Sequence, residues 1–228
     1  MNKSHLILNL KKILKRNQLL FILAYKGRHF LLRLSNWIHI GFSVSNNGVY
    51  SKLKYDIRGK GNSISIGRNV VLINVLIYIR GNGNNVVIQD DVLIMNSILW
   101  IEDNSNLILL GKNVTIEGAH MAVTGIEKKI VISDNSMLSN NITIRTGDSH
   151  AILNEKGEKI NVEKDIFIGK HVWIGSNVTI LKGVHIEDNS IVGTGSLVTD
   201  NISHSSIAVG IPAKVIKNNV SWIRDRYL

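Results

Sequence analysis

The sequence predicts an all-β fold, a parallel β-helix of six-residue repeats, and three observations lead to this prediction. First, an aliphatic residue occupies every sixth position within residues 162–199. Second, glycine directly follows several of these positions, and third, Asn or Asp recurs just before the next strand. Because Gly, Asn and Asp tolerate the positive φ of a sharp corner, each repeat can supply one short strand and one turn. The repeated aliphatic positions are Ile168, Ile174, Ile180, Ile186, Val192 and Val198.

The same spacing runs through the earlier part of the chain with interruptions. Roughly three repeats close one triangular coil, and stacked coils bury a continuous aliphatic column. Proline cannot donate to a strand ladder, and the single proline, Pro212, lies beyond the last repeat. We therefore expect the β-helix to cover residues 56–210. The aliphatic pairs of the earlier repeats are Ile64/Ile66, Val70/Leu72, Val86/Ile88, Val92/Ile94, Ile108/Leu110, Val114/Ile116, Ile130/Ile132 and Ile142/Ile144.

Sequence motifs in the C-terminal half add a family resemblance to this pattern. The repeats, the segment HVWIGSNVTILKG and the closing GIPAKVIK resemble the hexapeptide-repeat acyltransferases, and best the bacterial capsule and O-antigen sugar O-acetyltransferases. The resemblance covers most of residues 57–217. It implies a left-handed β-helix, which the general preference for right-handed parallel crossovers would not predict. It also implies acetyl transfer from acetyl-CoA to a sugar hydroxyl, in a homotrimer whose active sites lie between adjacent subunits.

The N-terminal segment, residues 1–55, accounts for the whole net charge of +10, because it contains Lys and Arg but no Asp or Glu. Its apolar residues have helical spacing, with basic residues among them. We expect a helical segment that caps the open first coil, and its basic face could also meet an anionic membrane or an anionic glycan. Nucleic acid is not expected, because no recognition motif accompanies the charge. The apolar positions are Leu6, Leu10, Ile13 and Leu14.

Composition narrows the class of protein. Of the 228 residues, 44% are hydrophobic and 19% are charged, which suits one main domain with an appendage. The absence of cysteine excludes a disulfide framework, a thiolate zinc site and a cysteine nucleophile. The N-terminal apolar run at residues 19–25 is too short to span a bilayer, and no signal-peptide cleavage pattern follows it. We expect a cytoplasmic protein whose basic segment could lie at the inner membrane face.

A break in the repeat marks the expected site of chemistry. The repeat stops after Ile144 and resumes at Ile166, and the extruded loop between them, about residues 145–165, has the turn signals of a hairpin-like arm. O-acetylation needs a base that removes a proton from a sugar hydroxyl, and imidazole suits this at neutral pH. His150 matches the loop histidine that is the base in the family. Asp148 is near enough in sequence to orient its ring.

Two other uses of these polar residues are open at this stage. Ser149 is a weak candidate for a nucleophile, because a serine next to a histidine in sequence seldom has triad geometry and no nucleophile elbow is present. A metal site like that of the carbonic anhydrases with this fold would need three converging imidazoles. His120 and His150 are spaced for successive coils, but His171 is the only third candidate, so we expect no metal.

The resemblance also assigns a coenzyme A site. Trp173 belongs to a VWIG motif that, in the family, lies in the cleft between subunits near the pantetheine arm; burial against a neighbouring subunit would also explain an outward tryptophan. Small residues let backbone amides approach the pantetheine closely, and a lysine pair matches the family's basic residues near the phosphates. Asp200 departs from the family, which often has Lys there. The expected acetyl-CoA residues are Trp173, Ser176, Gly193, Thr194, Gly195, Ser196, Lys214 and Lys217.

Fewer sequence features indicate the residues that bind the acceptor. Glu117, His120 and Asn141 lie on preceding coils and could line the acceptor pocket, although Asn141 is also an ordinary turn residue. The sequence therefore predicts an acetyl-CoA-dependent O-acetyltransferase for a surface polysaccharide sugar or its precursor. The alternatives are an acetyltransferase for a small acceptor such as a free sugar, serine or an antibiotic, or a catalytically silent β-helix scaffold. The tail, residues 211–228, is expected to form a short helix.

Overall fold

The computed structural model describes residues 42–45 and 48–225, and these form a parallel β-helix. The chain divides into two compact units, Met1–Ile40 and Gly41–Leu228. Up to residue 41, the expected basic helical segment lies outside the described residues, and so do its expected contacts. The first strands already precede the expected start of the β-helix at residue 56, because the described residues before that point pair with the next coil.

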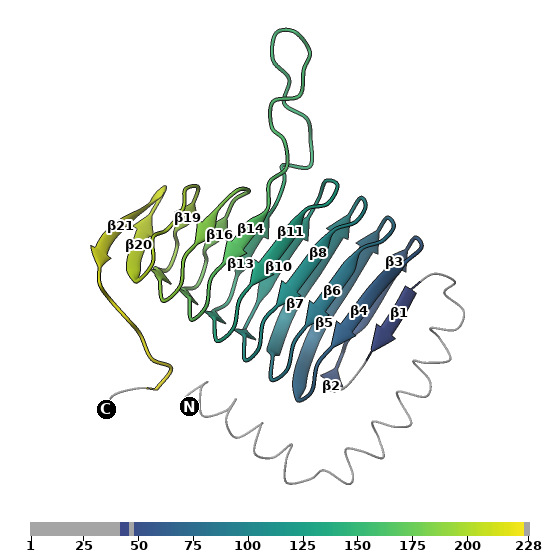
Figure 1. The fold of residues 1–228 in the computed structure, drawn as a ribbon, viewed down its shortest axis with the longest axis horizontal. Helices are drawn as coiled ribbons and strands as arrows, with labels where there is room; N and C mark the ends of the chain where they lie inside the picture. The colour runs from purple at the N-terminus through teal and green to yellow at the C-terminus, as the bar shows by residue number, and fades with distance from the viewer. Residues whose placement is uncertain (1–41, 46–47, 226–228) are drawn as a thin grey trace. The chain divides into compact units, whose positions relative to one another are not determined.

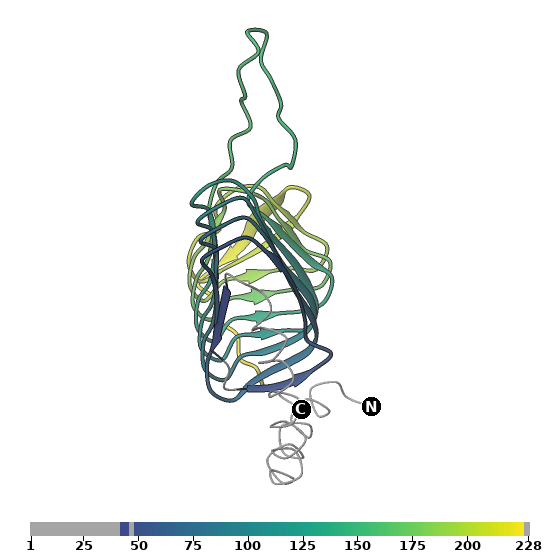
Figure 2. The same cartoon turned by 90° about the vertical axis from the view of Figure 1, so that its right-hand side faces the viewer.

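Each coil presents three faces, which we call face A, face B1 and face B2 in the order in which the chain forms them (Figures 1 and 2). Face A contains β1 (Phe42–Ser45), β4 (Asn62–Ile66), β6 (Asn85–Ile88), β8 (Leu107–Leu110), β11 (Lys129–Ile132), β14 (Ile166–Ile168) and β17 (His185–Ile186). Face B1 contains β2 (Gly48–Ser51), the first halves of β5 (Val70–Arg80) and β7 (Leu93–Glu102), then β9 (Thr115–Ile116), β12 (Met137–Leu138), β15 (Trp173–Ile174), β18 (Ile191–Val192) and β20 (Ser206–Gly210). Face B2 contains β3 (Lys54–Arg58), the second halves of β5 and β7, then β10 (Ala119–Val123), β13 (Ile142–Arg145), β16 (Thr179–Ile180) and β19 (Leu197–Val198).

The core is the aliphatic column that the repeat predicts. On face A, the inward residues pair in register from coil to coil and are at most 1% exposed. Full burial of one such side chain stabilises the fold by about 1.5–3 kcal/mol, so the column is the main source of stability. The face A column is Ile64, Val86, Ile108, Ile130 and Ile166.

The corner between face A and face B1 repeats one backbone conformation. Its residues have φ between 51° and 62°, the left-handed region that Asn and Asp tolerate. Their side chains also bond along the stack; for example, the Asn113 amide donates to Asn135 Oδ1 at 3.0 Å. The sequence pattern of Asn and Asp before each strand is thereby explained. The corner residues are Asn69, Asp91, Asn113, Asn135, His171, Asn189 and Ser205.

The coils are of two kinds. Just after the face A strands, backbone amides donate to Asp side chains of the next coil. The two partners are 22 residues apart in the early coils but 18 apart in the late ones. From Ile180 to Ile186 the chain passes from face B2 to face A in six residues, whereas the corresponding step from Leu99 to Leu110 takes eleven. The extra residues lie at the corner between face B2 and face A. We call residues 62–129 the enlarged coils and residues 166–202 the strict coils.

A buried polar ladder fills the enlarged corner. Asn62, Asn84 and Asn106 are at most 2% exposed. The Asn84 amide N–H donates to Asn62 Oδ1 at 2.9 Å, and the Asn106 amide N–H donates to Asn84 Oδ1 at 2.9 Å. Each buried side-chain amide therefore satisfies the backbone of the next coil, as buried polar groups require. These bonds explain why the repeat is interrupted at this corner without losing the stack.

The end of the chain differs from the sequence expectation. Within residues 211–225 the structure contains β21 (Ala213–Asn218) and no helix. β21 pairs antiparallel with β20, because the edge of β20 offers unpaired backbone groups and the β-branched residues of β21 favour a strand. Within the described ranges, no helix is both long enough and apolar enough to cross a bilayer.

Candidate active site

The extruded loop, residues 146–165, is a narrow antiparallel arm that leaves the stack between face B2 and face A (Figures 1 and 2). The Ile160 amide donates to the Ile152 carbonyl at 2.9 Å, and the Gly157 amide closes the tip on the Asn154 carbonyl at 2.9 Å. The expected hairpin-like arm is confirmed. It occupies the same corner that is enlarged in the early coils.

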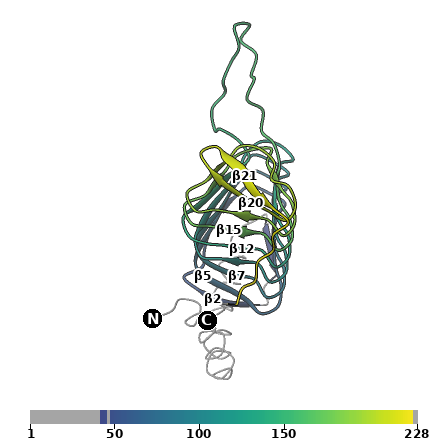
Figure 3. The same cartoon turned by 90° about the vertical axis from the view of Figure 1, so that its left-hand side faces the viewer.

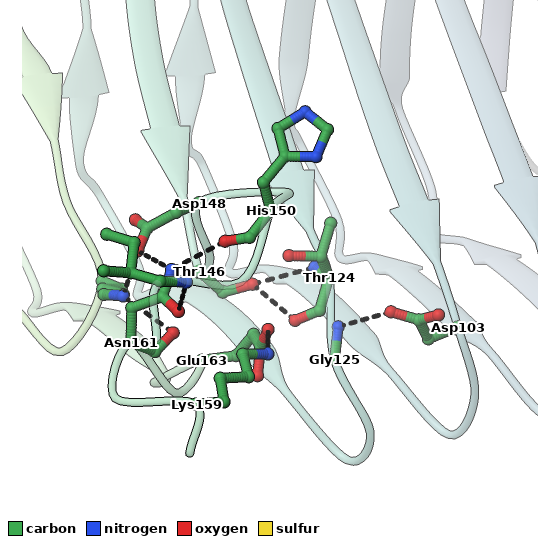
Figure 4. Close-up of polar contacts among 11 residues, drawn as sticks. Asp103, Thr124, Gly125, Thr146, Asp148, His150, Lys159, Asn161 and Glu163 are labelled. Carbon is green, nitrogen blue, oxygen red and sulfur yellow. Dashed lines mark hydrogen bonds and ion pairs between the residues drawn. The ribbon is translucent and has the colours of Figure 1, made fainter. Parts of the chain in front are cut away.

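The first residues of the arm are buried and bonded to the preceding coil. The Thr146 hydroxyl donates to the Thr124 carbonyl at 3.0 Å and accepts from the Thr124 amide at 2.9 Å. A Cβ on Gly147 would lie 2.4 Å from the Thr124 hydroxyl oxygen, so only glycine fits there. The arm therefore starts from a fixed position (Figure 4).

Asn161 joins the two sides of the arm at its base and is only 9% exposed. Its side-chain amide donates to Asp148 Oδ2 and to the His150 carbonyl, both at 2.8 Å, and its Oδ1 accepts from the Ile152 amide at 2.7 Å (Figure 4). Sequence reasoning missed this residue. The only mark in the sequence is the order Ile160-Asn161-Val162, because alternation along an extended strand turns Asn161 to the side opposite its apolar neighbours.

Asp148 has a different set of contacts from the one expected. Its carboxylate forms an ion pair with Lys182, whose ammonium also donates to the Asn161 carbonyl at 3.1 Å. Hydrogen bonds from Lys182 and then from Asn161 lower the pKa of Asp148 below its usual value. Within the described ranges, the carboxylate of Asp148 makes no hydrogen bond to the His150 imidazole. Lys182 lies on the next coil, so this competing cation becomes apparent only in the folded chain.

The backbone of His150 is fixed by a hydrogen bond, whereas its side chain makes none among the described residues. Its carbonyl is bound by Asn161, and the neighbouring Ser149 hydroxyl accepts from the Arg145 guanidinium at 2.8 Å. The imidazole is exposed and points away from the Asp148–Asn161 contacts (Figure 4). An imidazole presented in this way can take a proton from a bound hydroxyl. Ser149, by contrast, is engaged by Arg145 and makes no bond to the ring.

Several of the expected acceptor and cofactor residues lie on a second corner, between face B1 and face B2. Backbone bonds stack this corner from coil to coil, from the Asn177 amide to the Asn140 carbonyl at 3.0 Å and from the Gly195 amide to the Ser176 carbonyl at 2.8 Å. The whole width of face B2 separates this corner from the arm. From Asn141 at that corner to Thr146 at the start of the arm, the five residue steps span roughly 16 Å, taking about 3.3 Å for each step. One chain therefore does not bring His150 and this corner together. The corner carries Glu117, Asn141, Ser176, Thr194 and Gly195.

The small-residue strip at this corner, residues 193–196, offers fewer free backbone amides than expected. The Gly193 amide donates to the Ala208 carbonyl at 2.9 Å, and the Gly195 amide is already bonded as described. The buried Ser196 hydroxyl donates to the Gly193 carbonyl at 2.7 Å. The amide of Thr194, an exposed residue, has no acceptor among the described residues. Thr194 is therefore the position in this strip at which a ligand could accept a backbone hydrogen bond.

Trp173 and the lysine pair lie at the surface of the strict coils. Trp173 projects outward from β15 and is 39% exposed. Lys214 and Lys217 are exposed on β21. The Lys214 ammonium lies 3.1 Å from Asp200 Oδ2 and lowers the pKa of that carboxyl. Asp200 therefore competes with any anionic ligand for Lys214.

His120 stands on face B2, between the corner strip and the arm. Its Nε2 is buried and has no hydrogen-bond partner among the described residues, and its ring meets the edge of Trp100 at a centroid distance of 6.2 Å. Burial, and then the charge of Arg145, lower the pKa of His120, so its imidazole is neutral at neutral pH. Among residues 42–45 and 48–225, no three His, Cys, Asp or Glu side chains gather as a metal site.

Comparison with known proteins adds three findings. Residues 165–200 match the family model "Bacterial transferase hexapeptide (six repeats)". A polysialic acid O-acetyltransferase from Escherichia coli is 33% identical over 108 residues, which are 47% of this chain and 35% of that protein. A galactoside O-acetyltransferase from the same species is 42% identical over 99 residues, or 42% of this chain and 46% of that protein. The matched segments thus span about a third to a half of these relatives.

A solved structure extends the similarity to most of the chain. The crystal structure of the polysialic acid O-acetyltransferase OatWY covers 83% of this chain and 90% of its own, with 31% identity and a TM-score of 0.77. The predicted fold class, a left-handed parallel β-helix of hexapeptide repeats, is confirmed by this match.

Proposed function

The chain belongs to the hexapeptide-repeat transferases, and on that premise we propose that it is an acetyl-CoA-dependent O-acetyltransferase. We propose as acceptor a sugar hydroxyl of a surface polysaccharide or of its precursor. The observation that carries this function is the His150 imidazole, which is free and exposed on a backbone held by Asn161. The polysialic acid O-acetyltransferases similar to this chain support the choice of acceptor class.

The mechanism needs one proton carrier. His150 takes the proton of the acceptor hydroxyl as that oxygen attacks the thioester carbonyl of acetyl-CoA. A tetrahedral oxyanion forms, and backbone N–H groups in the cleft stabilise its charge. It collapses with cleavage of the carbon–sulfur bond, and the imidazolium returns its proton to the coenzyme A thiolate. The thioester is already activated, so no acyl-enzyme is required. In this scheme Asp148 holds the base of the arm rather than the imidazole.

Two chains would complete one site. The arm of one chain and the corner strip of another can form a cleft, whereas within one chain face B2 keeps them apart. The arm is suited to such a contact because its apolar residues are each more than half exposed. We infer a homotrimer, since cyclic closure gives three equivalent clefts, and light scattering should give three times the 25.4 kDa chain mass. A fully active monomer would contradict this assembly. The exposed apolar residues are Ile152, Leu153, Ile160 and Val162.

The cofactor would lie along the strict coils. Trp173 would cover the pantetheine arm, and the free Thr194 amide would donate to one of its carbonyls. Lys214 and Lys217 would face the phosphates, with Asp200 weakening the contribution of Lys214. On the acceptor side, Glu117 and His120 would line the pocket, and a shift of the His120 ring would let its Nε2 reach a sugar hydroxyl.

A thiol-release assay tests the function. Purified protein is given acetyl-CoA and one acceptor at a time, and the product mass is measured. The panel contains sialic acid polymer, nucleotide sugars and simple galactosides. The expected result is thiol release with a polymeric or precursor sugar. The galactoside similarity favours a small acceptor as the second candidate, so activity confined to simple galactosides would replace the proposed acceptor. No acceptor-dependent release across the panel would contradict the enzyme.

We place the protein in the cytoplasm, where its basic N-terminal segment would contact an anionic surface. The expected measurement is co-sedimentation with anionic vesicles that falls as salt rises. Neutralising Lys11, Lys12, Lys15 and Arg16 should weaken it. Binding that ignores salt, or no binding by the wild-type chain, would contradict this contact.

A further inference from the structure

The described tail after β21, residues 219–225, returns along the corner between face A and face B1, and we call it the strap (Figures 1 and 3). The Val220 amide donates to the Ser205 carbonyl at 3.0 Å. Trp222 and Arg224 then contact progressively earlier coils. The strap therefore crosses several coils that lie far from it in sequence.

Arg224 holds the far end of the strap. Its guanidinium donates to the carbonyls of Asn113, Asn135 and Ser136 at 3.0–3.1 Å, and to the Thr115 hydroxyl at 2.8 Å. Asn113 and Asn135 are corner residues with φ of 57° and 62°. One planar fork of donors thereby joins two successive coils, a geometry that Arg offers and Lys does not.

Trp222 makes the contact nearest to the candidate cofactor site. Its indole N–H donates to the His171 carbonyl at 2.7 Å, and its ring stacks on the His171 imidazole at a centroid distance of 4.3 Å and an angle of 12°. The same ring lies 6.0 Å from Trp173 with a tilt of 48°. Trp222 is 6% exposed, whereas Trp173 is 39% exposed. The strap thus places the Trp222 ring beside Trp173, which stays partly exposed.

We propose that Trp222 is a positioning residue, which holds the Trp173 ring in the orientation that receives acetyl-CoA. This inference rests on the proposed function, because that function places Trp173 against the pantetheine arm. A large exposed side chain has several rotamers, and confining it before the ligand arrives reduces the entropy lost on binding. The strap supplies the confinement from a segment 49 residues further along the chain than Trp173.

Two control variants separate a positioning role of Trp222 from a general effect of the strap on stability. Ile223, between the two anchoring residues, is 51% exposed. Its replacement by alanine should alter neither stability nor ligand binding, which makes it a matched control on the same segment. Ile108→Val, in the core of face A, provides a second control that lowers stability without touching the strap.

Calorimetric titration with coenzyme A alone tests the proposal without knowledge of the acceptor. Trp222→Leu should raise the Kd for coenzyme A about fivefold, through loss of the ring contacts. Trp222→Phe, which keeps a ring, should restore most of the affinity. Ile223→Ala and Ile108→Val should leave the Kd within about twofold of wild type. Equal weakening in Ile108→Val and Trp222→Leu, or none in Trp222→Leu, would overturn the positioning role.

Circular dichroism gives a readout that needs no ligand. The Trp173–Trp222 pair is close enough for an exciton couplet in the far ultraviolet. That couplet should disappear in Trp173→Phe and in Trp222→Phe, and persist in Trp100→Phe. Its persistence in Trp222→Phe would overturn the contact. A wild-type protein that fails to bind coenzyme A contradicts the proposed function instead, so the two failures are distinguishable.

Discussion

The enlarged coils of residues 62–129 and the strict coils of residues 166–202 share one aliphatic column and differ most at the corner between face B2 and face A. In the strict coils the step from face B2 to face A takes six residues, and aliphatic side chains fill the inside. In the enlarged coils the same step takes eleven, and a buried asparagine ladder fills the added space. The arm with His150 leaves the stack at this corner, on the boundary between the two regions.

The comparison shows that a solenoid can tolerate insertion at one corner when the backbone there stays satisfied. The longer strands of the enlarged coils also carry an outward aromatic stack, in which Tyr78 and Trp100 lie 3.6 Å apart. The strict coils instead have strands of two or three residues. Glycine lies at their corners, and a Cβ on Gly175 would lie 2.7 Å from the Thr194 amide nitrogen. The early region thus supports the arm, and the late region supplies the exposed strip assigned to the cofactor.

The largest effect should come from the arm at the boundary. Replacing His150 with alanine should lower kcat by roughly 100-fold or more, because the proposed general base is lost, while the KM for acetyl-CoA changes by less than about twofold. Steady-state thiol release measures both. His204→Ala replaces an exposed histidine that lies just after the strict coils; it serves as the control and should keep wild-type turnover. Wild-type turnover in His150→Ala would remove the arm from the chemistry.

The asparagine ladder predicts the largest change in stability. Asn84→Ala removes the bonds to the Asn106 amide and the Asp103 carbonyl, both 2.9 Å. It leaves the buried Asn106 amide unpaired, so the free energy of unfolding should fall by about 2–3 kcal/mol. Ile180→Val in the strict coils should cost only about 0.5–1.5 kcal/mol. Denaturant unfolding gives both values, and a smaller loss for Asn84→Ala would show that the ladder is dispensable.

The clamp at the base of the arm should affect rate more than fold. Asn161→Ala frees the His150 carbonyl and leaves the Asp148 carboxylate with Lys182 alone, so kcat should fall about tenfold as the backbone of His150 loses its fixed position. Hydrogen exchange should rise in residues 148–161 and stay unchanged in the strict coils. Lys156→Ala, at the exposed tip, is the matched control. Unchanged exchange in the arm would mean that the base holds without Asn161.

The ion pair beneath the arm predicts a dependence on pH. Lys182 and Asn161 lower the pKa of Asp148 in the folded chain, so the stabilisation is complete above the ordinary carboxyl pKa. It is lost as the pH falls through the lowered value. Resistance of the arm to proteolysis should therefore be flat from about pH 5 to 8 and decline below about pH 4. Asp148→Asn should remove this acid limb, whereas an unchanged limb would assign it to another carboxylate.

The smallest effect should lie in the strict region. Asp200→Asn frees Lys214 from its 3.1 Å ion pair, so the KM for acetyl-CoA should fall about twofold at low salt. Added salt should abolish the difference, since exposed charges are screened. Glu155→Gln on the arm tip removes the same charge elsewhere and should leave KM unchanged. An increase in KM for Asp200→Asn would show that Asp200 aids the cofactor rather than competing with it.

Much of the fold followed from local pattern, and much of the site did not. The inward Ile and Val positions and the left-handed Asn corners repeat at short intervals, so periodicity alone identifies them. The arm is also visible in sequence, as a gap in the period. Neither a periodic position nor a gap in the period marks Asn161 or Lys182 as part of the site. Their partners are chosen by proximity between segments, and the expected bond from Asp148 to His150 gave way to a nearer cation.

The sequence by itself determined the parallel β-helix, its aliphatic core, the corner residues and the histidine-bearing arm, because each depends on spacing along a few neighbouring residues. Only the tertiary structure decided that the arm and the small-residue strip stand on different corners of face B2, and that the strap returns from β21 to reach His171 and Asn113. These contacts join residues up to 111 positions apart. Which residues meet in these contacts depends on the number of residues at each enlarged corner, and periodicity within one repeat does not specify that number.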